Sequence, residues 1–168
     1  EALIGFFVNT LVISTEIGGQ MSSSELIGRV REVLLDAYPH QDLPFEKLVE
    51  ELQPERNMSV SPVVQAMFMM EAGDGEQLRL AGLEVSPVEI NESIPKYELT
   101  MHLGESDDRV IGSVEYNTDL FDRPTIERLI GHFKQIVTDI GRDCERRIRD
   151  LDLMTESEKS RLRELSRG

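Results

Sequence analysis

The three histidines are the first residues to test for chemistry, because imidazole is the commonest general base and a frequent metal ligand. They are His40, His102 and His132. None of them has the spacing of a metal-ligand set, and none stands beside a candidate nucleophile. We expect His132 to be an ordinary surface or boundary histidine on a helix, and His102 to lie in a strand as a partly buried hydrogen-bonding residue. The sequence therefore predicts no metal site and no catalytic residue of its own.

Cofactor motifs are also absent from the sequence. The pair Gly18-Gly19 lacks the third glycine and the lysine of a phosphate-binding loop, so ATP or dinucleotide binding is not expected. Cys144 is the single cysteine, which excludes an internal disulfide and paired-thiol metal sites. This cysteine usage fits a reducing, cytoplasmic location.

The charge balance excludes one large class of partners. Lys and Arg total 18 against 32 Asp and Glu, which gives a net charge of −14. Such a chain repels a phosphate backbone, so a nucleic acid partner is not expected. A membrane partner is not expected either, since no stretch approaches the ~20 apolar residues of a membrane span. No targeting segment is recognisable.

The first secondary-structure element that could position a functional site is a long apolar run near the start of the chain. Residues 5–13 form an apolar run that does not alternate with polar residues, apart from Asn9 and Thr10, which is typical of a strand covered on both faces. Ser22 and Glu25 form a capping box that opens a helix, and Pro39 ends it. Pro44 is suited to the first turn of a second helix.

Several strands are expected in the middle of the chain. Residues 63–70 form an apolar run, and residues 78–80 and 83–90 are shorter strand candidates. Residues 97–103 and 109–116 flank a polar turn and predict an antiparallel hairpin.

Two further helices follow. Asp122 and Pro124 open a long amphipathic helix that ends near Gly141, and Thr155 with Glu158 caps a short, lightly packed one. The order of elements predicts an α/β fold with a mixed or largely antiparallel sheet and flanking helices.

Three segments resemble core motifs of the condensation domains of nonribosomal peptide synthetases. Residues 4–11, 40–46 and 56–65 resemble the fifth, sixth and seventh motifs of that family, and further likeness covers nearly the whole chain. The third motif departs from the family pattern at Val60, where the family has an arginine, so no role of that arginine is carried over. The motif residues expected to be structural are Gly5, Phe7, Thr10, His40, Asp42, Pro44, Phe45, Arg56, Ser59 and Pro62.

Each motif also has a reading in plain structural terms. Asn9 is polar in an apolar run, so if buried it must either pin a neighbouring loop or face a substrate tunnel. Asp42 is placed to cap the helix at Pro44, with Phe45 packed beneath it. Arg56 can tether the loop that enters the next strand.

The resemblance implies the C-terminal lobe of a two-lobe fold like that of chloramphenicol acetyltransferase. In this family, carrier proteins present aminoacyl and peptidyl thioesters on phosphopantetheine arms, and the catalytic histidine belongs to a paired-histidine motif of the N-terminal lobe. No two histidines are adjacent here. We therefore expect the isolated chain to be inactive and to bind no cofactor directly, with Asn9 and Gln41 contributing to a tunnel wall. Residues 1–154 would form the lobe, and residues 155–168 would begin a linker toward an adenylation domain.

Other readings stay open at this point. The chain could be a non-catalytic module that docks carrier proteins or partner domains through its acidic face, or part of an epimerisation or cyclisation domain. The partners implied by the resemblance are carrier proteins, the N-terminal lobe and the adenylation domain. Because the strand expected at residues 5–13 is apolar on both faces, we also expect the isolated chain to self-associate.

Overall fold

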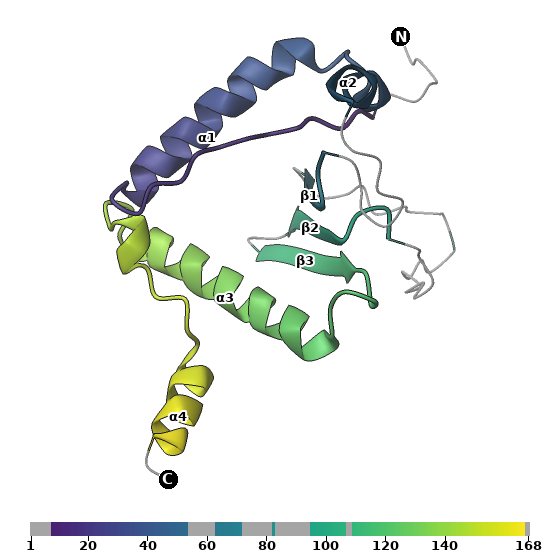
Figure 1. The fold of residues 1–168 in the computed structure, drawn as a ribbon. Coiled ribbons are helices and arrows are strands. Elements are labelled where there is room, and N and C mark those ends of the chain that lie inside the picture. The colour runs from purple at the N-terminus through teal and green to yellow at the C-terminus, as the bar shows by residue number, and fades with distance from the viewer. Residues whose placement is uncertain (1–7, 54–62, 72–81, 83–94, 107–108, 167–168) are drawn as a thin grey trace. The chain divides into compact units, whose positions relative to one another are not determined.

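A computed structural model gives the fold, which divides into two compact units (Figure 1). The first unit comprises Glu1–Gln53 and Pro124–Gly168, and the second comprises Pro54–Arg123. The structure describes residues 8–53, 63–71, 82, 95–106 and 109–166.

Helix α1, Ser23–Ala37, begins where the sequence predicts. The Ser22 hydroxyl accepts a hydrogen bond from the Glu25 amide at 3.2 Å, and the Glu25 carboxylate accepts one from the Ser22 amide at 2.8 Å. This reciprocal pair satisfies two amides that a helix start leaves without partners. The helix passes into a 3₁₀ turn, η1 (Tyr38–His40), as expected because Pro39 has no N–H to continue the α-helical ladder.

Helix α2, Phe45–Leu52, starts one residue later than predicted, since Pro44 is its N-cap with an extended ψ of 139°. The prediction that Asp42 caps this helix is wrong. A capping side chain acts from the N-cap position itself, and Asp42 lies two residues before it. The Pro44 carbonyl instead accepts from the amides of Lys47 and Leu48 at 3.0 and 3.2 Å.

The strand expected at residues 5–13 is not formed in the part that the structure describes. Residues 8–17, hereafter the strap, have no regular secondary structure, and residues 5–7 lie outside the described residues. A strand needs a hydrogen-bonded neighbour, and no described strand pairs with the strap. Nor is the run covered on both faces, because Val8 is 68% exposed. The strap instead runs alongside α1 (Figure 1), where the Arg29 guanidinium donates to the Glu16 carbonyl at 2.8 Å.

Helix α3, Arg123–Arg142, is the long amphipathic helix of the prediction and buries Ile126. The segment that follows it, including the 3₁₀ turn η2 (Ile148–Asp150), pairs with the start of α1. Four backbone hydrogen bonds make this connection: Ser23 N to Arg146 O (3.0 Å), Ser24 N to Cys144 O (2.7 Å), Ile148 N to Met21 O (2.8 Å) and Arg149 N to Gly19 O (3.1 Å). Ser23 is fully buried there. Unpaired amides at the start of α1 thus find carbonyl partners in the segment after α3, which fastens the two helices together.

Helix α4, Glu156–Leu165, closes the first unit and carries the predicted capping box of Thr155 and Glu158. Its apolar residues Leu162 and Leu165 are 53% and 70% exposed, so it is lightly packed, as expected. Among the helices described, none has both the length and the apolar character needed to cross a bilayer.

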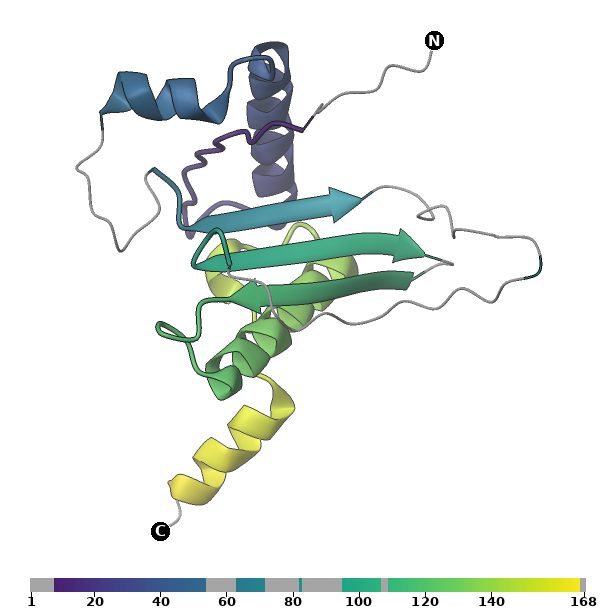
Figure 2. The same cartoon turned by 90° about the vertical axis from the view of Figure 1, so that its right-hand side faces the viewer.

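The second unit contains a mixed sheet, in which β2 (Leu99–Ser106) lies between β1 (Ala66–Glu71) and β3 (Arg109–Tyr116) (Figure 2). Strands β2 and β3 pair antiparallel, which confirms the predicted hairpin, whereas β1 and β2 pair parallel. The strand candidates at residues 78–80 and 83–90 lie outside the described residues.

Gly112 allows β3 to pack closely against β2. A Cβ at this position would lie 2.5 Å from Leu103 Cδ2 and 2.7 Å from the His102 carbonyl oxygen. Gly104, on the other strand of the hairpin, has open space where its Cβ would stand. A side chain is therefore tolerated at position 104 and excluded at position 112.

Candidate functional site

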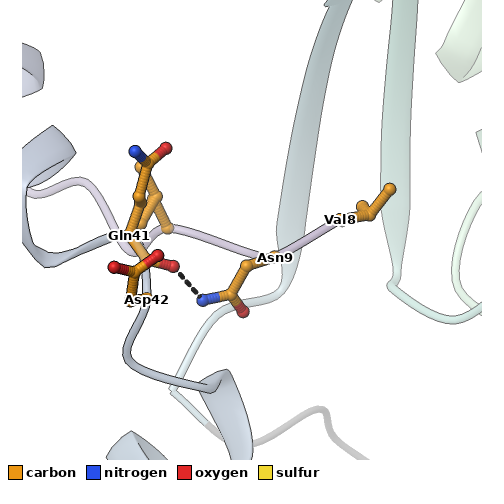
Figure 3. Close-up of a pocket in the computed structure, with 5 residues that line it drawn as sticks. Val8, Asn9, Gln41 and Asp42 are labelled. Carbon is orange, nitrogen blue, oxygen red and sulfur yellow. Dashed lines mark hydrogen bonds between the residues drawn. The ribbon is translucent and has the colours of Figure 1, made fainter. Parts of the chain in front are cut away.

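The strap is held to the loop before α2 by the side chain of Asn9 (Figure 3). Asn9 Nδ2 donates to the backbone carbonyls of Gln41 and Leu43, both at 2.6 Å. Its Oδ1 accepts from the Thr10 amide at 2.9 Å. Both donor hydrogens of the amide are thus used by the loop, and only acceptor capacity is left for another molecule.

The loop presents these carbonyls because it is a succession of turns. The Gln41 amide donates to the Tyr38 carbonyl at 3.1 Å, and the Leu43 amide donates to the His40 carbonyl at 3.0 Å. The amides of residues 41 and 43 thus have partners inside the loop, and their carbonyls have a partner in Asn9.

A pocket of about 530 Å³ lies at this contact and is lined by Val8, Asn9, Leu11, Gln41 and Asp42. The side chain of Gln41 points away from Asn9, whereas its backbone carbonyl faces the Asn9 amide (Figure 3). The structure therefore brings the two predicted tunnel residues to one pocket. Their hydrogen bonds show the loop-pinning alternative for Asn9, and a tunnel-wall role for either residue stays a prediction.

The other motif residues divide into those near this pocket and those outside the described structure. Thr10 and Phe45 are half-buried, and Asp42 and His40 are exposed. Pro44 is exposed and is the N-cap of α2. The other five motif residues lie outside the described residues: Gly5, Phe7, Arg56, Ser59 and Pro62.

The histidines outside the loop have structural surroundings. His102 lies half-buried in β2 opposite Ser113. His132 lies on α3 with its Nε2 at 2.9 and 3.0 Å from the two carboxylate oxygens of Glu158. Its side chain is 35% exposed, so it lies at the boundary between interior and surface, as predicted. Within the described part of the chain, no three His, Cys, Asp or Glu side chains are grouped so that they could hold a metal ion.

Asp139 is a buried charged residue that the sequence analysis missed. It is 5% exposed, and its Oδ2 accepts from Arg146 Nη1 at 2.9 Å and from the Asp152 amide at 3.1 Å. It follows Ile136 by three residues, so it lies on the apolar face of α3. An acidic residue at a core position of the helical period is the signal that could have revealed it.

A second polar cluster joins α4 to the segment before it. Hydrogen bonds from Thr155, and then from His132, hold the pKa of Glu158 down at about 2. Lys159 Nζ donates to Asp152 and also to Glu156, the latter at 3.0 Å. The hydrogen bond between Asp152 and Lys159 lowers the pKa of Asp152 and raises the pKa of Lys159.

A family model described as "Condensation domain" matches residues 1–163 of this chain. The chain belongs to the condensation-domain family. A linear gramicidin synthase of Brevibacillus parabrevis is 45% identical to this condensation-domain chain over 164 residues, covering 96% of the chain and 2% of the synthase. Malpinin synthetase of Mortierella alpina is 40% identical over 164 residues, covering 98% of the chain and 2% of the synthetase. The chain thus spans a small fraction of the curated relatives it matches.

Solved structures of condensation-type domains have the same fold. The X-domain from teicoplanin biosynthesis, solved in complex with OxyB, superposes with a TM-score of 0.74 at 28% identity, over 86% of this chain and 32% of that one. A four-domain nonribosomal peptide synthetase bound to AMP and glycine superposes with a TM-score of 0.69 at 22% identity, over 86% of this chain and 12% of that one. The predicted family and its α/β, chloramphenicol-acetyltransferase-like fold class are confirmed.

Proposed function

We propose that this chain is the C-terminal portion of a condensation domain that forms peptide bonds in nonribosomal peptide synthesis. The observation that carries the proposal is the match of the condensation-domain model to residues 1–163. In the reaction, the amine of an acceptor aminoacyl thioester attacks the carbonyl carbon of a donor thioester. The amide bond forms, the carbon–sulfur bond breaks, and the phosphopantetheine thiol of the donor carrier protein leaves with the proton that the amine gives up.

The part played by this chain is positioning. Asn9 fixes the backbone of residues 41 and 43, and with them one wall of the pocket that the strap and loop enclose. Fixing reacting groups can supply several kcal/mol of barrier lowering, so a wall that carries no catalytic group still affects the rate. The phosphopantetheine arm would enter as a substrate tether and not as a resident cofactor.

The test is a single-turnover condensation assay in the parent synthetase with both carrier proteins already loaded. We expect Asn9→Ala to slow dipeptide formation while its melting temperature stays within about 4 °C of the wild type. Asn9→Asp should slow it as well, because the substituted side chain keeps an acceptor but loses both donors. Asp36→Asn, on the exposed surface of α1, is the matched control and should condense at the wild-type rate.

An Asn9→Ala enzyme that condenses at the wild-type rate would overturn the positioning role. If Asn9→Ala unfolds, Asn9 is a residue of stability and not of the site. The isolated chain, given two loaded carrier proteins, should form no dipeptide thioester, and product above background would contradict the placement of the catalytic histidine outside it.

The surroundings of the chain follow from the same proposal. Residues 1–154 would be the lobe and residues 155–168 the start of a linker, with the N-terminal lobe, the carrier proteins and an adenylation domain as partners in one cytoplasmic synthetase. Self-association of the isolated chain no longer rests on a strand at residues 5–13. It is supported by exposed apolar side chains in the second unit, where Phe68 and Met70 are 58% and 57% exposed. Light scattering that finds a stable monomer of 19.1 kDa would contradict it.

A further inference from the structure

Polar contacts tie the segment after α3 to that helix at Asp139 and at a second position. Asp139 accepts from the Asp152 amide at 3.1 Å, and the Asp152 carboxylate pairs with Lys159 of α4. Nearer the middle of α3, His132 Nε2 lies 2.9 Å from Glu158 Oε1. The segment from residue 152 to α4 is therefore tied to α3 at two places.

These two places are well separated along the helix. His132 and Asp139 are seven residues apart, which corresponds to about 10 Å along α3 at ~1.5 Å per residue. One tether would leave α4 free to swing, whereas two tethers at this separation fix its direction as well as its position. The polar groups at both tethers are partly shielded from water, since the side chains of His132, Glu158 and Lys159 are 35%, 24% and 26% exposed.

A close backbone approach marks the same place on α3. A Cβ on Gly131 would lie 3.2 Å from Thr155 Cγ2, so glycine makes room for the residue that caps α4. Gly141, near the end of the same helix, has nothing within 4 Å of its would-be Cβ. Gly131 and His132 are adjacent in sequence, and both contact residues at the N-terminal end of α4.

We propose that Gly131 and His132 form a seat on α3 for the N-terminal end of α4, so that the chain leaves the first unit in a fixed place and direction. Gly131 admits Thr155, and His132 holds Glu158, whose carboxylate also accepts from the Thr155 amide at 2.8 Å. The Glu158 carboxylate thus both caps the N-terminus of α4 and holds α4 to α3. Gly131 and His132 are positioning residues and touch no reacting group.

The seat has a consequence that rests on the proposed function. If the residues after α4 lead to further domains of a synthetase, a fixed direction of α4 limits where those domains begin. It therefore raises the effective concentration of an attached carrier protein at the condensation domain to which it presents its thioester. A carrier protein supplied as a separate chain gains nothing from the seat. Loosening the seat should therefore slow condensation from an attached carrier and spare condensation from a free one.

Hydrogen exchange of the α4 amides in the parent synthetase tests the seat directly. We expect Gly131→Ala and His132→Ala to speed exchange across residues 156–165 about tenfold. Gly131→Ala pushes Thr155 away and His132→Ala removes one charge-assisted hydrogen bond, so in both variants α4 should detach from α3 more often. His132→Gln should restore much of the protection, because its side-chain amide also donates to a carboxylate. Gly141→Ala is the matched control, since it adds the same methyl group to the same helix where space is open.

The outcomes separate the seat from the proposed function. Unchanged exchange in Gly131→Ala and His132→Ala, or equal acceleration in Gly141→Ala, overturns the seat. Faster exchange with equal condensation rates from attached and free carriers overturns the positioning consequence. A wild-type synthetase that forms no peptide bond from loaded carriers counts against the proposed function alone, and the exchange measurement still decides the seat.

Discussion

Two polar contacts in the first unit each hold a non-helical segment in place, and they differ in kind. The Asp139 carboxylate, on a residue that is 5% exposed, accepts hydrogen bonds from a guanidinium and from a backbone amide. At Asn9 a neutral amide on an exposed strap donates to two loop carbonyls. A hydrogen bond to a buried charged group contributes more than an exposed neutral one, because water competes for the exposed one.

The difference indicates that the Asp139 contact contributes mainly to stability and the Asn9 contact mainly to the shape of the pocket. The Asp139 contact holds together the end of α3 and the segment that leads to α4, so its loss should be felt as stability. The Asn9 contact shapes the pocket, and because its hydrogen bonds are exposed, its loss should cost less stability. Stability and pocket geometry are thus assigned to different polar groups of one unit.

The largest effect on stability should come from removing the carboxylate of Asp139. Asp139→Ala is expected to lower the free energy of unfolding of the parent condensation domain by about 3 kcal/mol, for two hydrogen bonds to a charged group at ~1.5 kcal/mol each. Asp139→Asn keeps an acceptor and should lose clearly less. Denaturant titration measures both, and a loss below ~1 kcal/mol in Asp139→Ala would remove the contrast with Asn9.

The start of α1 should be the next most sensitive place. Ser22→Ala removes the acceptor for the Glu25 amide and should lower the free energy of unfolding by about 1 kcal/mol. Ser14→Ala, on the exposed part of the strap, is the control and should leave stability unchanged. Equal losses in the two variants would mean that the junction between α1 and α3 is not the stable part of the unit.

Asn9→Ala should change the loop more than the stability. We expect a loss of unfolding free energy below about 1 kcal/mol, because the two lost hydrogen bonds are exposed. Exchange of the amides of Gln41 and Leu43 should nevertheless become faster, since their turn is no longer held by the strap. Destabilisation as large as that of Asp139→Ala would contradict the division between stability and pocket geometry.

Features set by neighbours in sequence could be predicted from the sequence. The capping boxes of Ser22 with Glu25 and of Thr155 with Glu158 need only four consecutive residues, and both form as predicted. The hairpin of β2 and β3 is likewise local. The family, too, was predicted from short motifs, because their residues recur in a fixed order along the chain.

Features that depend on distant partners could not be predicted in this way. The apolar run at residues 5–13 predicted a strand, but a strand also needs a neighbour, and hydrophobicity does not name one. Asp139 was missed because a charged residue in a helix is by default assigned to the solvated face, and its partner Arg146 lies beyond the helix end. For Asn9 the sequence left two alternatives, and only coordinates could place the Gln41 carbonyl against its amide.

The smallest and most local effect is the acid response of the contact that fastens α4. Glu158 accepts hydrogen bonds from Thr155 and from His132, which lower its pKa from 4.5 to about 2. A carboxyl group whose pKa is lowered on folding stabilises the fold in its ionised form, so its contribution is fully present above pH 4.5 and is lost as the pH falls through about 2. Glu158→Gln removes the titrating group, and the stability advantage of the wild type over this variant should shrink as the pH falls from 4.5 to about 2. Asp139 lies at the other tether and is unchanged in both proteins, so it does not contribute to this difference. An advantage of the wild type that stays the same down to about pH 2 would show that the ionised carboxylate of Glu158 is not what fastens α4.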